Sequence, residues 1–350
     1  MSHLAHITGL AAATLTGAFF STAAAGAEYT AALKSFAVND AQTDRPLEGV
    51  VWYPATAGAP TTRVQGNPVW TGVDAAESAQ IAAGTFPLVV LSHGMYGNMR
   101  NQNWLASELA ADGYIVAAVN HPGTSTFLRA QDDARQLWER PRDISRVITH
   151  FTKAGDISAQ VDDTRIYMAG HSLGGWTAVM LSGGISDPER FDAFCASGAD
   201  PFVCAIMDRW DIAKTPEDRA MMAQDYADDR ISAVAVFDLG GTQFFSEQSL
   251  ENIAVPLLVI GAPKNVTQLD LDLESRHLAK AVPDDVVTYL EPETVSHFDF
   301  LGLCTPKAVA ILRAEEPDDV IVCLDGIEER QSDHAGIVSA VKAHFTQTRP

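Results

Sequence analysis

Two patterns of apolar residues alternate along this chain. Short, mostly apolar runs are typical of buried strands, and stretches with apolar residues every three or four positions are typical of amphipathic helices. The first pattern predicts strands at 33–38, 50–53, 86–91, 114–119, 165–169, 231–237, 256–260 and 286–290. The second predicts helices at 101–112, 141–153, 176–181, 216–225 and at the C-terminus, where Ile337, Val338, Val341 and Phe345 share one face. Strands that alternate with helices predict an α/β fold, with a mostly parallel central sheet and helices on both faces.

Two segments depart from this rhythm. Residues 55–85 are rich in Gly, Pro, Thr and Ala, which predicts a loop. Residues 185–230 contain Asp/Pro/Gly clusters, two cysteines and a polar helical stretch, which we interpret as a cap-like insertion over the sheet. With 350 residues, of which 47% are hydrophobic, the chain can form one large core. We therefore predict a single domain over residues 28–350 that carries the insertion at 185–230.

The N-terminus has the composition of an export signal. The first 27 residues contain no Asp, Glu, Lys or Arg, and residues 9–20 are apolar or small. Ala25-Gly26-Ala27 supplies the small residues that a signal peptidase requires, with Glu28 as the expected mature N-terminus. A membrane anchor is the alternative, but the stretch is short and rich in Ala, Thr and Gly, which favours cleavage. We predict a signal peptide over 1–27 and a periplasmic or secreted protein whose mature chain has no membrane span.

Charge and cysteine content narrow the partners. The formal net charge is −21, from 24 basic and 45 acidic residues with no basic stripe, which argues against a nucleic-acid partner. An even number of cysteines in an exported chain favours disulfides, and the simplest of the three possible connectivities pairs Cys195 with Cys204 and Cys304 with Cys323. Their spacing lacks the paired C-x-x-C of a zinc site, so neither a metal nor a cofactor is implied.

The chemistry centres on the motif Gly170-His171-Ser172-Leu173-Gly174. It follows a mostly apolar run at 165–169 and precedes a helical pattern at 176–181, which is the strand–turn–helix context of a nucleophile elbow. Such a tight turn requires small residues on both sides of the serine, and Gly170 and Gly174 supply them. The pattern predicts that Ser172 is a nucleophile exposed above the carboxyl edge of the sheet.

A nucleophilic serine needs a base and an acid that orients the base, and in this context they follow the serine in the order acid, then histidine. The downstream histidines are His277, His297, His334 and His344, of which only His297 follows a strand end. We predict His297 as the base.

The acid is predicted from strand ends in the same way. Asp238 ends the run 234–237 before two glycines, which places it at the same edge of the sheet, so we predict Asp238 as the acid. Asp270 and Asp272, at a polar helix start, are the alternatives, whereas Asp299 is too close to His297 in sequence to be preferred.

Two backbone N–H groups are the predicted oxyanion donors. One is that of Leu173, which follows the nucleophile, and the other is that of Met95, in the loop after the strand at 86–91. His93, in the same loop, is predicted to hold the loop through both ring nitrogens. We expect the run at 120–123, with His121, to shape the pocket without transferring a proton.

The ordered set of motifs resembles a known family. It comprises the run 88–97 with Ser-His-Gly, the Asn-His-Pro-Gly at 120–123, the Gly-His-Ser-Leu-Gly-Gly at 170–175, the strand that ends in Asp238, and the Val-Ser-His-Phe at 295–298. Together they resemble bacterial predicted dienelactone hydrolases, which are similar to the platelet-activating-factor acetylhydrolases of the α/β-hydrolase superfamily. The resemblance implies an α/β-hydrolase fold and supports Asp238 as the acid. True dienelactone hydrolases use a cysteine nucleophile, whereas this chain has Ser172.

These observations predict a serine esterase that acts on a small-molecule ester through an acyl-enzyme. A peptidase or amidase could use the same three residues. A non-catalytic binding protein on the same scaffold is the weaker alternative, because serine, acid and histidine are all present in order.

Overall fold

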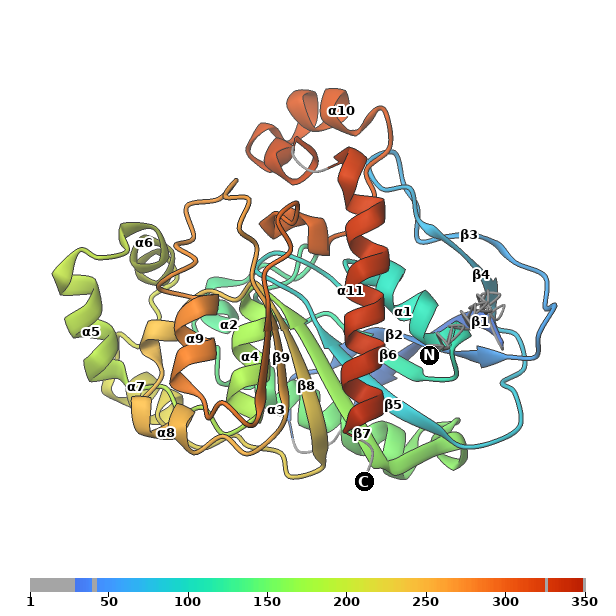
Figure 1. Cartoon of the computed structure of the whole chain (residues 1–350), viewed down its shortest axis with the longest axis horizontal. Coiled ribbons are helices and arrows are strands. Elements are labelled where there is room, and N and C mark those ends of the chain that lie inside the picture. Colours follow the sequence, from blue (N-terminus) through green and yellow to red (C-terminus); the bar gives the residue numbers. More distant parts are fainter. Residues whose placement is uncertain (1–28, 40–42, 325–326, 349–350) are drawn as a thin grey trace, which may run out of the picture.

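The computed structural model of the chain describes residues 29–39, 43–324 and 327–348 (Figure 1). The predicted signal peptide at 1–27 lies outside the described residues. Within the described part, ten strands form one sheet in the order β10-β9-β8-β7-β5-β6-β2-β1-β4-β3. The strands are β1 (Thr30–Val38), β2 (Leu47–Ala55), β3 (Thr62–Val64), β4 (Val73–Glu77), β5 (Phe86–Ser92), β6 (Ile115–Val119), β7 (Val161–His171), β8 (Ile231–Phe237), β9 (Leu257–Ile260) and β10 (Val287–Leu290).

The sheet is mostly parallel, as predicted. From β10 to β6 every neighbouring pair runs parallel, and β2 runs antiparallel to both β6 and β1. After β6 the chain crosses to the other side of β5 to form β7, so the strand order reverses at β5. In open α/β sheets the site lies where the order reverses, outside the carboxyl ends of the strands. This topology places the ends of β5, β7 and β8 at one edge.

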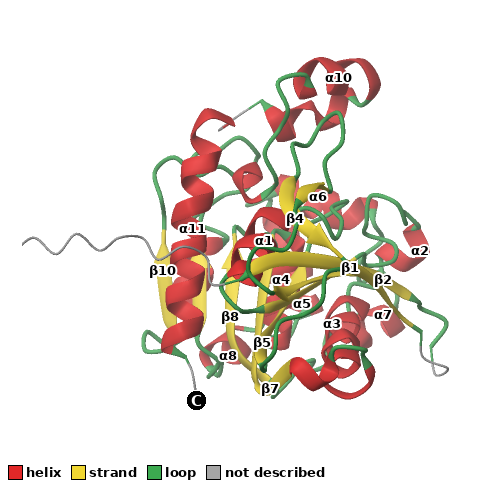
Figure 2. Cartoon of the chain, turned by 90° about the vertical axis from the view of Figure 1, so that its right-hand side faces the viewer, coloured by secondary structure: helices red, strands yellow, loops and turns green. Residues whose placement is uncertain are grey.

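Helices cover both faces of the sheet (Figure 2). The helices of the described residues are α1 (Asn103–Ala111), α2 (Gln131–Ala134), α3 (Glu139–Thr149), α4 (Leu173–Leu181), α5 (Pro188–Ser197), α6 (Pro201–Arg209), α7 (Pro216–Met222), α8 (Glu247–Glu251), α9 (Ser275–Ala281), α10 (Ala308–Glu315) and α11 (Ile327–Gln347). Helices α3 and α4 pack in the core on one face, and α1 and α11 pack in the core on the other. No helix in the described ranges is long and apolar enough to cross a bilayer.

Three sequence expectations need correction. The expected loop at 55–85 contains β3 and β4, which extend the sheet beyond β1. The edge strand β3 and its neighbour β4 are only three and five residues long and are held by backbone pairing, so they leave no long apolar run. The helix expected at 141–153 begins two residues earlier and ends in a π-helical turn at His150–Ala154. The C-terminal helix, predicted from apolar residues at 337–345, begins earlier, at Ile327, and so contains His334.

Two disulfides hold the segments that rise above the carboxyl edge. Cys195 of α5 is bonded to Cys204 of α6, and Cys304 is bonded to Cys323 at the end of a 3₁₀ helix at Pro317–Cys323, which follows α10. The predicted pairing is therefore confirmed. The first disulfide joins helices of the segment 185–230, and the second ties down α10, which the sequence pattern did not predict.

Candidate active site

The motif at 170–174 forms a sharp turn between β7 and α4. Ser172 has φ 55° and ψ −121°, a backbone conformation that is strained for a residue with a side chain. Its N–H donates to the carbonyl of Phe237 at 2.9 Å, which ties the turn to the end of β8. A Cβ on Gly170 would lie 2.1 Å from the carbonyl oxygen of Gly174, so the two sides of the turn approach too closely for any other residue. The predicted need for small flanking residues is confirmed.

Gly174→Ala is expected to destabilise the fold by about 3 kcal/mol or more, the upper end for overpacking. The added Cβ would lie 1.9 Å from the carbonyl oxygen of Ser92, a backbone atom of β5 that cannot move without disturbing the sheet. Urea denaturation measures the change. Gly336→Ala is the matched control, because Gly336 lies in α11 with no atom within 4 Å of an added Cβ. The control should gain about 0.5–1 kcal/mol. A Gly174→Ala protein as stable as the wild type would contradict this account of the turn.

His297 and Asp238 lie in direct contact. His297 Nδ1 is 2.6 Å from Asp238 Oδ2, and both side chains are buried. Asp238 follows β8 directly, and its other oxygen accepts the N–H of Ala262 at 3.0 Å. His297 begins a short 3₁₀ helix, His297–Phe300, which Ser296 and Asp299 cap reciprocally. The carboxylate is therefore fixed by two donors, and the loop that carries the imidazole is fixed by its own cap.

The alternative residues lie in other settings. Asp270 and Asp272 are exposed, and each has a local partner. Asp270 Oδ1 accepts the N–H of Asp272 at 2.9 Å, and Asp272 forms an ion pair with Arg276. Asp299 forms an ion pair with Arg330 of α11, in which neither side chain is exposed. Among the candidate acids, Asp238 is the one hydrogen-bonded to His297.

His334 supports the loop that carries His297. Its Nε2–H donates to the carbonyls of Asp299 and Leu301 at 2.8 and 3.0 Å, and its ring stacks on Trp104. Burial lowers the pKa of His334 to about 4. An unfolded chain takes up a proton at histidine below about pH 6.5, before the folded protein does. His334 therefore contributes its full stability above that pH, and the contribution falls by up to about 3 kcal/mol as the pH drops towards 4.

His334→Gln is expected to make the folded protein less sensitive to acid. Glutamine keeps an N–H donor for the two carbonyls but does not titrate. The fall in Tm between about pH 6.5 and pH 4.5 should be shallower in the variant than in the wild type. Thermal unfolding across that range measures both slopes. Equal slopes would mean that this histidine is not linked to acid unfolding.

The two predicted oxyanion donors lie on facing segments. Leu173 is the first residue of α4, so no carbonyl of its own helix can accept its N–H. Met95 is the second residue of a turn at 94–97, which the Gly97 N–H closes by donating to the Gly94 carbonyl at 3.1 Å. The Met95 N–H takes no part in that bond. A Cβ on Gly94 would lie 3.0 Å from the Ser172 Cβ, so the turn passes directly beside the serine. Both N–H groups therefore come from the backbone around Ser172.

His93 holds this turn as predicted. Its Nδ1–H donates to the carbonyl of Gly94 at 2.7 Å, and its Nε2 accepts the N–H of His121 at 3.1 Å. The expectation that the run 120–123 shapes the pocket is wrong, because none of these residues lines the cavity described next. His121 is completely buried behind the turn and contacts Ser92 and Asp143.

A cavity of about 590 Å³ opens above the carboxyl edge. Ser172, Leu173, Met95 and His297 all line it, and Asp238 lies behind His297. The structure therefore brings the five predicted site residues together. One wall comes from α6, with Phe202, Val203, Ile206 and Met207, and another from α10 and the 3₁₀ helix after it, with Leu312, Ile321 and Val322. Its volume is within the range of cavities that hold drug-sized ligands.

Sequence reasoning missed two side chains next to these residues. His171 Nε2 lies 2.9 Å from the carbonyl of His297, so its N–H can hold the loop of the predicted base. The position of His171 within the motif at 170–174 was the sequence feature that could have identified it. Arg140 of α3 is buried and contacts the turn at Gly94 through His93. Arg140 lies four residues before Ile144 and therefore on the apolar face of α3. A charged side chain is not expected to be buried on that face.

Comparison with known proteins establishes the class. The model of the alpha/beta hydrolase family matches residues 89–310, well over half of the chain, and the chain belongs to this family. A curated relative, the bis(hydroxyethyl) terephthalate hydrolase of Streptomyces coelicolor, is 28% identical over 92 residues, a match that spans 26% of this chain and 27% of the relative. A ferulic acid esterase from Streptomyces cinnamoneus has a similar fold, with a TM-score of 0.62 and 20% identity over 93% of this chain and 92% of that one. The narrower resemblance to dienelactone hydrolases and acetylhydrolases stays a prediction.

Proposed function

We propose that this protein is a serine esterase that cleaves carboxylic esters through an acyl-enzyme, with Ser172 as nucleophile, His297 as base and Asp238 as the acid that orients it. The observation that carries the proposal is the 2.6 Å contact between His297 Nδ1 and Asp238 Oδ2, beside a cavity lined by both His297 and Ser172. The names of the two similar proteins, a terephthalate ester hydrolase and a ferulic acid esterase, support ester substrates.

The proposed mechanism follows from proton positions. Asp238 accepts Nδ1–H of His297, which leaves Nε2 free to take the proton from Ser172 Oγ as that oxygen attacks the ester carbonyl carbon. The N–H groups of Leu173 and Met95 stabilise the negative charge that develops on the carbonyl oxygen. His297 then gives its proton to the departing alkoxide. Water repeats the sequence on the acyl-enzyme and releases the acid, with no cofactor required.

The cavity and the disulfides extend the proposal. A volume of about 590 Å³ is much larger than a short acyl group needs, so we propose esters with a bulky, largely apolar group.

Within residues 29–39, 43–324 and 327–348, no cluster of three or more His, Cys, Asp or Glu is placed to bind a metal. The two disulfides support a periplasmic or secreted location, and the segment 185–230 acts in this proposal as a cap that supplies one cavity wall.

Two measurements test the proposed function. A fluorophosphonate probe should label the protein once, at Ser172, because only an activated serine reacts with it. A p-nitrophenyl ester should be cleaved faster than a p-nitroanilide of the same acyl group. Faster anilide cleavage would make the protein an amidase, and the absence of both labelling and turnover would make it a binding protein on a hydrolase scaffold.

A further inference from the structure

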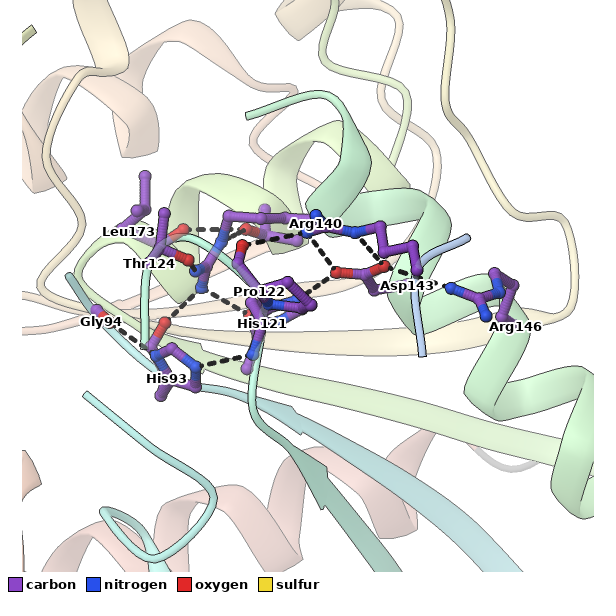
Figure 3. Close-up of polar contacts among 12 residues, drawn as sticks. His93, Gly94, His121, Pro122, Thr124, Arg140, Asp143, Arg146 and Leu173 are labelled. Carbon is purple, nitrogen blue, oxygen red and sulfur yellow. Dashed lines mark hydrogen bonds and ion pairs between the residues drawn. The ribbon is translucent and has the colours of Figure 1, made fainter. Parts of the chain in front are cut away.

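Arg140 connects helix α3 to the turn that carries Met95. Its guanidinium is buried, with a relative exposure of 1%, and its donors reach four oxygens (Figure 3). Nη2 donates to the His93 carbonyl and to Ser92 Oγ, the latter at 3.1 Å. Nη1 donates to Thr124 Oγ1 at 2.5 Å, and Nε donates to Thr177 Oγ1 at 3.0 Å. One side chain therefore joins β5, the loop after β6, and α4.

Behind Arg140 lies a second set of serine, histidine and aspartate. Ser92 Oγ is 3.0 Å from His121 Nε2, and His121 Nδ1 is 2.9 Å from Asp143 Oδ2. All three side chains are completely buried, and none lines the cavity, so this set cannot meet a substrate. Its connectivity resembles that of a catalytic triad, but its place in the fold gives it a supporting role.

The proton positions in this set follow from its partners. Asp143 accepts two hydrogen bonds from Arg45 at 2.9 Å each, so it is an acceptor for His121 Nδ1–H as well. His121 Nε2 must then accept from Ser92 Oγ–H, and Ser92 Oγ accepts from Arg140. Burial and the nearby Arg140 lower the pKa of His121 well below its usual range, which keeps the imidazole neutral. Every contact has a donor and an acceptor, so the set is internally consistent.

These contacts determine where the Met95 N–H points. The Gly94 carbonyl and the Met95 N–H belong to one planar trans peptide, in which the two groups point in opposite directions. The Gly94 carbonyl is held by His93 Nδ1 at 2.7 Å and by the Gly97 N–H at 3.1 Å. The preceding peptide is held through the His93 carbonyl by Arg140. Fixing these carbonyls on the buried side directs the Met95 N–H away from them.

We propose that Arg140, braced by the Ser92–His121–Asp143 set, is a positioning residue that aims the Met95 N–H at the developing oxyanion. The inference rests on the proposed function, in which Met95 is an oxyanion donor. Arginine suits the task because its rigid planar fork reaches several acceptors at once, whereas lysine presents a single flexible ammonium. The effect of Arg140 is therefore expected in the transition state and not in the binding of the ester.

Arg140→Lys tests the inference because it keeps the charge and loses the fork. Removing one oxyanion donor outright reduces kcat by about 10²–10³, so misaligning one should reduce kcat by about 10- to 100-fold with KM changed less than about twofold. Affinity for a trifluoromethyl ketone, which forms a tetrahedral oxyanion on the serine, should fall by the same factor as kcat. Rates are counted per active site by fluorophosphonate titration, so that loss of folded protein does not appear as loss of kcat.

Arg230→Lys is the matched control. Arg230 is also an arginine with several hydrogen bonds to α3, through the Ser145 carbonyl and Thr149 Oγ1, but it has no contact with the turn. Its substitution is expected to lower Tm and to leave kcat and inhibitor affinity unchanged. If Arg140→Lys does not fold, Ser92→Ala decides alone, because it removes only one hydroxyl from the set. Its expected loss is about three- to tenfold in kcat, again without a change in KM.

The outcomes separate the inference from the proposed function. A folded Arg140→Lys or Ser92→Ala protein with wild-type kcat and inhibitor affinity would overturn the inference, and so would a loss confined to KM. A wild-type protein that neither reacts with the fluorophosphonate nor cleaves an ester would overturn the proposed function itself. Parallel losses in kcat and ketone affinity, with the control unaffected, would establish Arg140 as a positioning residue.

Discussion

Ser172→Ala is expected to reduce kcat on a p-nitrophenyl ester by about 10⁴–10⁶ and to leave the fold intact. Ser172 lines the cavity, and alanine removes only the oxygen that would attack the carbonyl. The residual rate would come from the oxyanion donors and from substrate binding. Steady-state kinetics and thermal unfolding of the purified variant measure both effects.

Ser182→Ala and the buried Ser92 make this test specific. Ser182 follows α4 and donates to the Ala178 carbonyl at 2.9 Å, away from the cavity, so its substitution should leave kcat unchanged. Ser92 is hydrogen-bonded to His121, which is hydrogen-bonded to Asp143. Because Ser92 has 0% exposure, it should not react with a fluorophosphonate. Labelled peptides should therefore contain Ser172 alone. Near-normal turnover by Ser172→Ala, or labelling of Ser92, would refute the proposed nucleophile.

Asp238→Asn is expected to lower kcat by about 10²–10⁴. The structure gives a specific reason beyond the lost charge. Asp238 accepts from two donors, the Ala262 N–H at 3.0 Å and His297 Nδ1 at 2.6 Å. An asparagine has one acceptor oxygen for these two donors. If the oxygen keeps the Ala262 N–H, the amide NH₂ faces His297 and forces the proton onto Nε2, the atom that must accept from Ser172.

Asp270→Asn and Asp272→Asn are the matched controls for this prediction. Both residues are exposed on the segment before α9, with only local partners. Their kcat values should stay within a few-fold of the wild type, because neither side chain has a contact with His297. Kinetics of the three variants on one ester decide between them. A crippled Asp270→Asn or Asp272→Asn enzyme with an active Asp238→Asn enzyme would move the acid to the segment after β9.

The sequence predicted the central sheet well because its strands are buried on both faces. β8 has the predicted bounds, Ile231–Phe237, and the buried strands β5, β6 and β9 differ from the prediction by about one residue, as does the partly buried edge strand β10. Strands β3 and β4 were missed, since β4 pairs with β1 and the edge strand β3 pairs with β4, and at three and five residues they leave no long apolar run. Helix α10 was missed because it packs outside the main core and leaves no long apolar pattern either. It packs in a small separate cluster, which a disulfide closes.

The sequence by itself determined the motif at Ser172, and it predicted the acid and the histidine after it and the simplest of three disulfide pairings, because each of these depends on residues that are close in the chain or on a fixed order along it. Only the tertiary structure decided what surrounds them. Arg140, Asp143 and His121 resemble ordinary polar residues in the sequence, yet all three are buried behind the Gly94 turn. A charge can be buried only when partners replace the water that it loses. Those partners, Arg45, Ser92 and Thr177, come from segments far apart in the chain, so no local pattern could reveal that these side chains would meet.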